Sequence, residues 1–93
     1  MARIERTGQF KRDYKRESKG RHRVTLERDF ITVVTMLMSG EPLPTKYRDH
    51  ALVGDWSDHR DCHVKPDLIL LYRSFSDGRL QLVRLGSHSE LGL

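Results

Sequence analysis

The hydrophobic residues of the chain follow two different periods along its length. In the first half they recur at helical spacing, with Phe10 and Tyr14 four residues apart inside the largely charged segment 9–19. A second helical stripe follows residue 25, and it consists of Phe30, Val33, Val34, Leu37 and Met38. Because residues three and four apart share one face of a helix, both segments are predicted to be amphipathic helices.

Residues that favour caps mark the ends of both predicted helices. Thr7 is predicted to cap the N-terminus of the first helix, and Gly20 to stop it. Thr25 is predicted to begin the second helix, and Gly40, which precedes two prolines, to end it. Only a few residues separate the two helices, so we expect an antiparallel helical hairpin.

The hydrophobic pattern of the second half is typical of strands. Residues 67–73 are almost continuously apolar, as expected of a strand that is covered on both faces. Segments 58–64 and 79–85 alternate in part between apolar and polar residues, and the sequence Ser-Asp-Gly at 76–78 is a hairpin turn signal. Weak alternation over residues 3–7 predicts a short first strand.

The resulting order is one strand, two helices, three strands and a short helical turn over 87–91, where Ser87 and Glu90 have the spacing of a capping box. This order predicts a single α+β domain over residues 1–93. Its expected architecture is a small antiparallel sheet, mixed with the N-terminal strand, with the helical hairpin packed on one face. Residues 41–55 are predicted to form a long loop, and loops of this length within small domains are often functional.

Charge is spread unevenly over the chain, whose net charge is +4. Residues 1–24 carry nine Lys and Arg against three acidic residues, which suggests either a polyanionic partner or a solvated helix face. No run is apolar enough for a membrane span or a signal peptide. The only cysteine, Cys62, has no internal partner. These features predict a protein of the cytoplasm that does not bind membranes.

Residues 47–67 hold three of the five histidines, the only cysteine and the only tryptophan. On a helix, His59 and His63 would share a face and chelate a metal ion. On a strand they would lie roughly 13 Å apart, which is too far for one ion. Because the strand pattern is better supported, we expect no metal site. A strand also directs Cys62 away from His63, so we expect no thiol nucleophile.

Acid–base chemistry fits the same segment better. Strand alternation places His59, Asp61 and His63 on one face. A three-residue turn over 64–66 would set His63 opposite Asp67, whereas a two-residue turn would separate them. A hydrogen-bonded surface pair without catalytic function is the alternative interpretation.

Three more side chains are expected near that face, namely His50 from the long loop, Arg84 from the last strand and His88 just after it. A metal-free ribonuclease requires a base for the 2′-hydroxyl, an acid for the 5′-oxygen and a cation for the developing charge. Histidine suits the first two roles because it titrates near neutral pH.

The same residues carry a resemblance to the YafQ branch of the RelE-type bacterial toxins. It extends over nearly the whole chain, and its most specific parts are Asp-His at 49–50, His-x-x-x-Asp at 63–67 and Gly-Ser-His at 86–88. The resemblance implies a RelE-like fold and a ribosome-dependent mRNA endoribonuclease. Such an enzyme cleaves mRNA in the ribosomal A site through 2′-hydroxyl attack, without a cofactor or a metal ion.

The resemblance also implies roles for individual residues. The family's catalytic residues match His50, His63, Asp67 and His88. Asp67, aided by His63, is expected to be the general base and His88 the general acid, although the two roles are exchangeable. His50 is expected to orient the phosphate. The basic residues expected to contact RNA phosphates are Arg84, Lys11, Lys15 and Arg60. One departure is Gly92, where the family pattern has an aromatic residue that could stack on a base.

The partners implied are the ribosome, mRNA and an antitoxin that inhibits the toxin and acts with it as co-repressor. We expect a monomeric toxin and an oligomeric complex with the antitoxin. Two alternatives share the fold or the basic charge: a ParE-like poison of DNA gyrase, which has no need of the histidines, and a non-catalytic RNA-binding module. Few aromatic residues are free for base stacking, which argues against the RNA-binding module.

Overall fold

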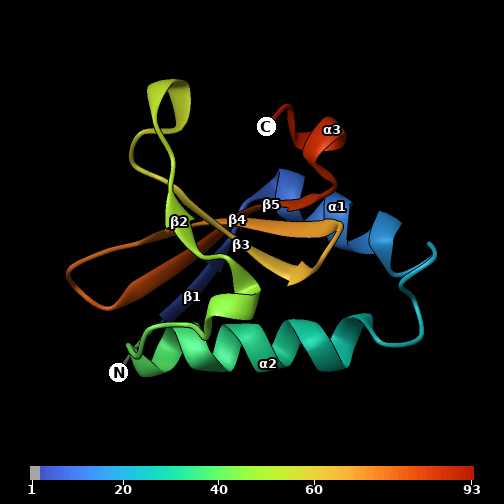
Figure 1. Cartoon of the computed structure of the whole chain (residues 1–93), viewed down its shortest axis with the longest axis horizontal. Coiled ribbons are helices and arrows are strands. Elements are labelled where there is room, and N and C mark those ends of the chain that lie inside the picture. The colour runs from blue at the N-terminus through green and yellow to red at the C-terminus, as the bar shows by residue number, and fades with distance from the viewer. Residues whose placement is uncertain (1–2) are drawn as a thin grey trace.

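The computed structural model describes residues 3–93 and contains one five-stranded sheet, shown in Figure 1. The strand order across the sheet is β1-β5-β4-β3-β2. β1 runs parallel to β5, and the other neighbours are antiparallel. The predicted mixed sheet is therefore confirmed. The strands are β1 (Arg3–Arg6), β2 (His50–Ala51), β3 (Arg60–Lys65), β4 (Leu68–Ser74) and β5 (Arg79–Gly86).

Three α-helices accompany the sheet: α1 (Gly8–Glu17), α2 (Leu26–Ser39) and α3 (His88–Leu91). The Thr7 hydroxyl accepts a hydrogen bond from the Phe10 N–H at 3.0 Å, which confirms the predicted cap of α1. Gly40 ends α2 in the left-handed conformation, with φ 79°. Thr25 precedes α2 but makes no side-chain cap bond, because its hydroxyl accepts a hydrogen bond from the Lys65 ammonium instead.

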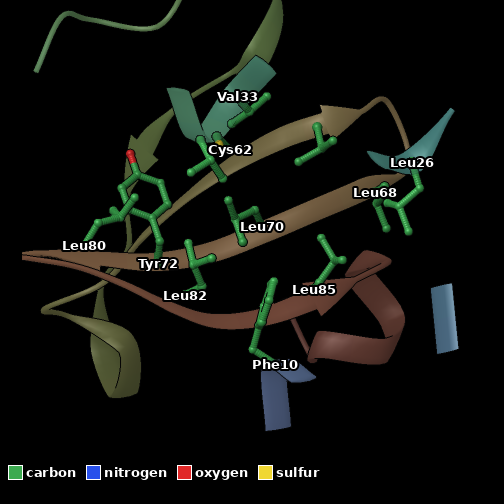
Figure 2. Packing of buried hydrophobic residues seen from close by; sticks show 12 residues of the cluster. Phe10, Leu26, Val33, Cys62, Leu68, Leu70, Tyr72, Leu80, Leu82 and Leu85 are labelled. Carbon is green, nitrogen blue, oxygen red and sulfur yellow. The ribbon is translucent and has the colours of Figure 1, made fainter. Parts of the chain in front are cut away.

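The hydrophobic core lies between α2 and one face of the sheet, and α1 contributes Phe10 at the β5 side (Figure 2). The alternation of β3 is as predicted, because Cys62 and Val64 point into this core. Phe30 of α2 packs against Phe10 and Tyr14 of α1, with ring centroids 5.7 and 5.1 Å apart. These aromatic contacts join α1 to α2.

The segment 41–55 is more ordered than a long loop. It contains two short 3₁₀ helices, η1 (Thr45–Tyr47) and η2 (Gly54–Trp56), with β2 between them. β2 pairs through its backbone with β3, and this pairing sets His50 beside Asp61. A two-residue strand has no period to detect, so the sequence pattern did not reveal it.

The turn between β3 and β4 differs from the three-residue turn that would set His63 opposite Asp67. Lys65 pairs with Leu68, so the turn contains only Pro66 and Asp67. A shift of register between His63 and Lys65 then places His63 opposite Ile69. Of the two alternatives, the structure has the one in which a two-residue turn separates His63 from Asp67, because proline suits the first central position of such a turn.

α3 lies above one end of the face of the sheet that is opposite α2 (Figure 1). Asp61 and His63 alternate with the core residues Cys62 and Val64 along β3, so they belong to this opposite face. None of the helices in residues 3–93 combines the length and the apolar character that crossing a bilayer requires.

Candidate active site

His50 is fixed by the residue before it in the chain. The Asp49 carboxylate accepts two hydrogen bonds from Arg60, at 3.3 and 3.2 Å, and one from the Tyr72 hydroxyl at 2.5 Å. These bonds tie the loop to β3 and β4. The Nδ1 atom of His50 lies 3.0 Å from the Arg48 carbonyl, which can only accept a hydrogen bond. Nδ1 therefore carries the hydrogen, and Nε2 remains free for chemistry.

Asp61 is a buried carboxyl at the base of the site, with 2% of its surface exposed. Its Oδ1 lies 3.0 Å from His50 Nδ1, but no donor in residues 3–93 makes a well-aligned hydrogen bond to that oxygen. We attribute this to the N–H of His50, which points to the Arg48 carbonyl instead. Burial raises the pKa of Asp61, and the positive charges of His50, His63 and His88 oppose that rise. The charges of three histidines thus act on one buried carboxyl.

His63 and His88 form the closest pair of histidines, with ring centroids 5.3 Å apart. His63 comes from β3, and its Nδ1 lies 3.1 Å from the Pro66 carbonyl. This contact again assigns the hydrogen to Nδ1 and leaves Nε2 free.

His88 is the first residue of α3. The predicted capping box is confirmed there, because Ser87 and Glu90 exchange hydrogen bonds of 3.2 and 2.9 Å. The cap therefore fixes the helix start that carries His88.

The structure brings together the predicted residues His50, His63 and His88 from three separate elements. A base and an acid within a few ångströms of each other are the requirement for proton transfer to and from one phosphodiester.

Asp67 does not belong to the same contact network. Its carboxylate forms an ion pair with Arg21, and its Oδ1 lies 3.0 Å from Nε2 of His22. Both partners lie in the connection between α1 and α2. The His22 side chain is only 16% exposed. Burial lowers the pKa of His22, as do the nearby charges of Arg21 and Lys65.

Arg84 reaches the edge of the site from β5. It lies opposite Leu71, which in turn lies opposite Asp61, so it shares the face of the histidines. Its Nε donates to the fully buried Asp13 carboxylate at 2.7 Å.

The other residues predicted to contact phosphate lie in two different environments. Lys11 and Lys15 are exposed on α1, whereas the Arg60 guanidinium is engaged with Asp49.

The residues that first suggested a metal cluster diverge. Cys62 is buried in the core, and this burial raises the pKa of its thiol. His59 precedes β3 and packs edge-on against Trp56, with ring centroids 5.1 Å apart. His63 faces the opposite side of the sheet from Cys62. Strand geometry therefore separates these groups, as the sequence predicted.

Two features of the site went beyond the sequence prediction. Asp61 was placed on the correct face, but nothing in the local pattern indicated that it would be buried among histidines. The contacts of Arg21 and His22 with Asp67 join segments more than forty residues apart in the chain, and no periodicity signals them.

Gly92 ends α3 in the left-handed conformation, with φ 71°. A Cβ atom at this position would meet no atom of the described chain within 4 Å. There is space for a side chain, but the backbone conformation is one that residues other than glycine adopt at a cost.

The chain resembles known proteins over nearly its whole length. Residues 2–92 match the family described as "Bacterial toxin of type II toxin-antitoxin system, YafQ". The chain is 39% identical over 89 residues to the mRNA interferase toxin YafQ of Escherichia coli K12, an alignment covering 95% of this chain and 92% of that protein.

Solved structures agree with this relationship. The crystal structure of YafQ from E. coli strain BL21(DE3) matches with a TM-score of 0.84 at 36% identity, covering 98% of both chains. The crystal structure of the E. coli DinJ-YafQ complex matches with a TM-score of 0.79 at 34% identity, again over 98% of both chains. This protein therefore belongs to the YafQ family of toxins from bacterial type II toxin–antitoxin systems.

Proposed function

We propose that the protein is a ribosome-dependent mRNA endoribonuclease that cleaves mRNA in the A site by metal-independent acid–base catalysis. The observation that carries this proposal is the His63–His88 pair, 5.3 Å between ring centroids, beside the buried Asp61. The name of the E. coli relative, an mRNA interferase toxin, supports the same activity. Translation is the process that this cleavage would inhibit.

In the proposed reaction, Nε2 of His63 accepts the proton of the 2′-hydroxyl. The 2′-oxygen attacks the adjacent phosphorus, and a 2′,3′-cyclic phosphate forms as the bond to the 5′-oxygen breaks. Protonated His88 donates its proton to that leaving oxygen. The two histidines exchange protonation states over the reaction, and the assignment of acid and base can be reversed without changing the balance.

The charge of the phosphate is met by the remaining groups. His50 and Arg84 are proposed to orient and neutralise the non-bridging oxygens, which carry more charge in the transition state. The Asp61 carboxylate balances the single positive charge that the histidine pair must hold. Asp67, the fourth predicted catalytic residue, supports His63 from the adjacent turn.

The exposed lysines Lys11 and Lys15 are proposed to contact ribosomal RNA phosphates. Arg60 lies on the other face of the sheet, opposite Tyr72 and paired with Asp49, so it is not proposed as a phosphate contact of this site. A cognate antitoxin is the expected inhibitor and co-repressor in the cytoplasm, by analogy with the E. coli complex that contains both DinJ and YafQ.

The deciding experiment substitutes His88→Ala and maps mRNA ends by primer extension on a translated reporter after induction. A reporter without a start codon tests ribosome dependence. The wild type is expected to cleave only the translated reporter, and His88→Ala to lose cleavage by about 100-fold or more. Ser89→Ala, one residue along α3, is the matched control and should cleave as the wild type does.

Full toxicity of His88→Ala, with its fold and antitoxin binding intact, would overturn the assignment. Growth arrest without any mRNA cleavage, but with broken DNA, would instead identify a gyrase poison of the same fold.

A further inference from the structure

The turn between β3 and β4 is held from outside the sheet by the connection between α1 and α2. Arg21 and His22, both in that connection, contact the Asp67 carboxylate through the ion pair and the 3.0 Å approach described above. We call these three residues the turn latch. They border a surface cavity of about 230 Å³ that reaches the start of α3 and is lined by Glu17, Arg21, His22, Asp67, Ser87 and Glu90.

The same turn provides the hydrogen-bond acceptor of His63. The Pro66 carbonyl, one peptide bond before Asp67, lies 3.1 Å from His63 Nδ1. A carbonyl oxygen has no hydrogen to give, so this contact selects the imidazole tautomer with hydrogen on Nδ1. The position of one backbone carbonyl thus decides whether Nε2 is available.

The Asp67 carboxylate faces Arg21 and His22 rather than His63 and His88. Its two carboxylate oxygens lie against Arg21 and His22, while His63 lies opposite Ile69 across the sheet. A carboxylate occupied by two donors is poorly placed to take a proton from RNA. Within residues 3–93, Asp67 is connected to His63 through its neighbour in sequence, Pro66, whose carbonyl contacts the His63 ring.

We propose that Asp67, Arg21 and His22 are positioning residues, which hold the Pro66 carbonyl where it fixes the Nδ1–H tautomer of His63. The inference rests on the proposed role of the His63–His88 pair. It assigns a task to the connection between α1 and α2, and it makes Asp67 act through His63 rather than on the substrate. Geometry errors of this kind are costly in catalysis, because small displacements of a reacting group lower its reactivity steeply.

The first test reads the tautomer of His63 directly, by long-range ¹H–¹⁵N correlation spectra of the imidazole rings at alkaline pH. The wild-type protein is expected to show the Nδ1–H form of His63. Asp67→Ala and the double variant Arg21→Ala/His22→Ala should each give a mixture of the two tautomers. This readout needs no RNA, so it remains informative even if the protein does not cleave mRNA.

The second test compares cleavage of ribosome-bound mRNA under single-turnover conditions. Arg21→Ala/His22→Ala leaves the Asp67 carboxylate in place, yet its rate should fall by about 10-fold to 100-fold, as for Asp67→Ala. Combining all three substitutions should cause little further loss, because the latch acts as a unit.

A charge exchange separates the two possible roles of Asp67. Arg21→Asp/Asp67→Arg restores an ion pair of reversed direction but removes the carboxylate from position 67. We expect it to recover the Nδ1–H tautomer and a substantial part of the cleavage rate relative to Asp67→Arg alone. Arg23→Ala is the matched control, because it removes an exposed arginine of the same connection that bonds only to the Gly20 carbonyl.

Two results would overturn the inference. One is an unchanged His63 tautomer in both Asp67→Ala and Arg21→Ala/His22→Ala. The other is full cleavage by the Arg21→Ala/His22→Ala variant together with no recovery in the charge exchange, which would make Asp67 a direct catalytic group.

Discussion

Asp61 occupies an environment that a carboxylate normally avoids. It is almost fully buried, and its Oδ1 accepts no well-aligned hydrogen bond from residues 3–93. Such a group is costly unless positive charge lies close to it. Here that charge comes from histidines, whose protonation is the proposed working part of the site. The buried Asp61 carboxylate is therefore expected to lower the free energy of unfolding, as groups held in unfavourable environments at functional sites often do.

The pH dependence of unfolding tests the state of Asp61. Its pKa is raised in the folded protein, so the folded state binds the proton more tightly than the unfolded state does. The stability of the wild type relative to Asp61→Asn should therefore fall as the pH rises above about 4, which is near the unfolded value. Urea unfolding between pH 4 and pH 7 measures this difference.

Asp55→Asn is the control for that experiment, because Asp55 is exposed in η2 and should give a nearly constant difference. A difference that stays flat or rises with pH for Asp61→Asn as well would contradict the raised pKa.

At the level of elements, side chains of α1 provide hydrogen-bond partners for the part of β5 that β1 does not pair with. β1 pairs with β5 only as far as Leu82, and the backbone beyond that point needs other partners. The Asp13 carboxylate accepts the Leu85 N–H at 3.1 Å, and Arg16 donates to the Leu85 carbonyl at 2.9 Å. One helix turn thus satisfies the strand edge and holds Arg84 next to the site.

Asp13→Ala should destabilise the fold by about 3 kcal/mol, because it leaves Arg84 and a backbone N–H without their partner. Burial raises the pKa of Asp13, but hydrogen bonds from Arg84, Leu85 and Gln9 outweigh it and leave the pKa below its ordinary value. The stabilisation is therefore complete above about pH 4 and is lost as the pH falls through the lower folded pKa.

Urea unfolding of Asp13→Ala at pH 7 and pH 2.5 measures both effects. The exposed Asp58→Ala serves as control. Equal stability of Asp13→Ala and the wild type at pH 7 would show that the cluster contributes nothing.

At the scale of the whole molecule, the hydrophobic core and the candidate active site lie on opposite sides of the sheet. α2 and the hydrophobic core lie on one side of the sheet, while α3 lies on the other (Figure 1). α1 connects the two sides, because Arg16 contacts Glu90 of α3 at 3.3 Å. The basic helix α1 is thus linked to the helix that begins with His88.

Replacing Lys11 and Lys15 with glutamine should weaken ribosome association and reduce its salt dependence, with the log–log slope falling by roughly 1 to 2. Sedimentation binding at several salt concentrations measures the slope. Arg28→Gln removes an exposed charge from α2 and should leave the slope unchanged. An unaltered slope in the lysine variant would place the ribosome contact elsewhere.

Local pattern alone determined the elements and their faces. Helical spacing placed Phe10 and the α2 stripe in the core, and strand alternation placed Cys62 and His63 on opposite faces of the sheet, because each face depends only on neighbouring residues. The caps at Thr7, Gly40 and Ser87 were readable for the same reason.

Only the tertiary structure decided the contacts of the charged groups. Because the turn contains only Pro66 and Asp67, Asp67 is separated from His63 and contacts Arg21 and His22 instead. Asp61 is the buried carboxyl of the site. A one-residue shift in a turn and a contact between distant segments leave no periodic trace in a sequence, because both are fixed by the packing of elements against one another.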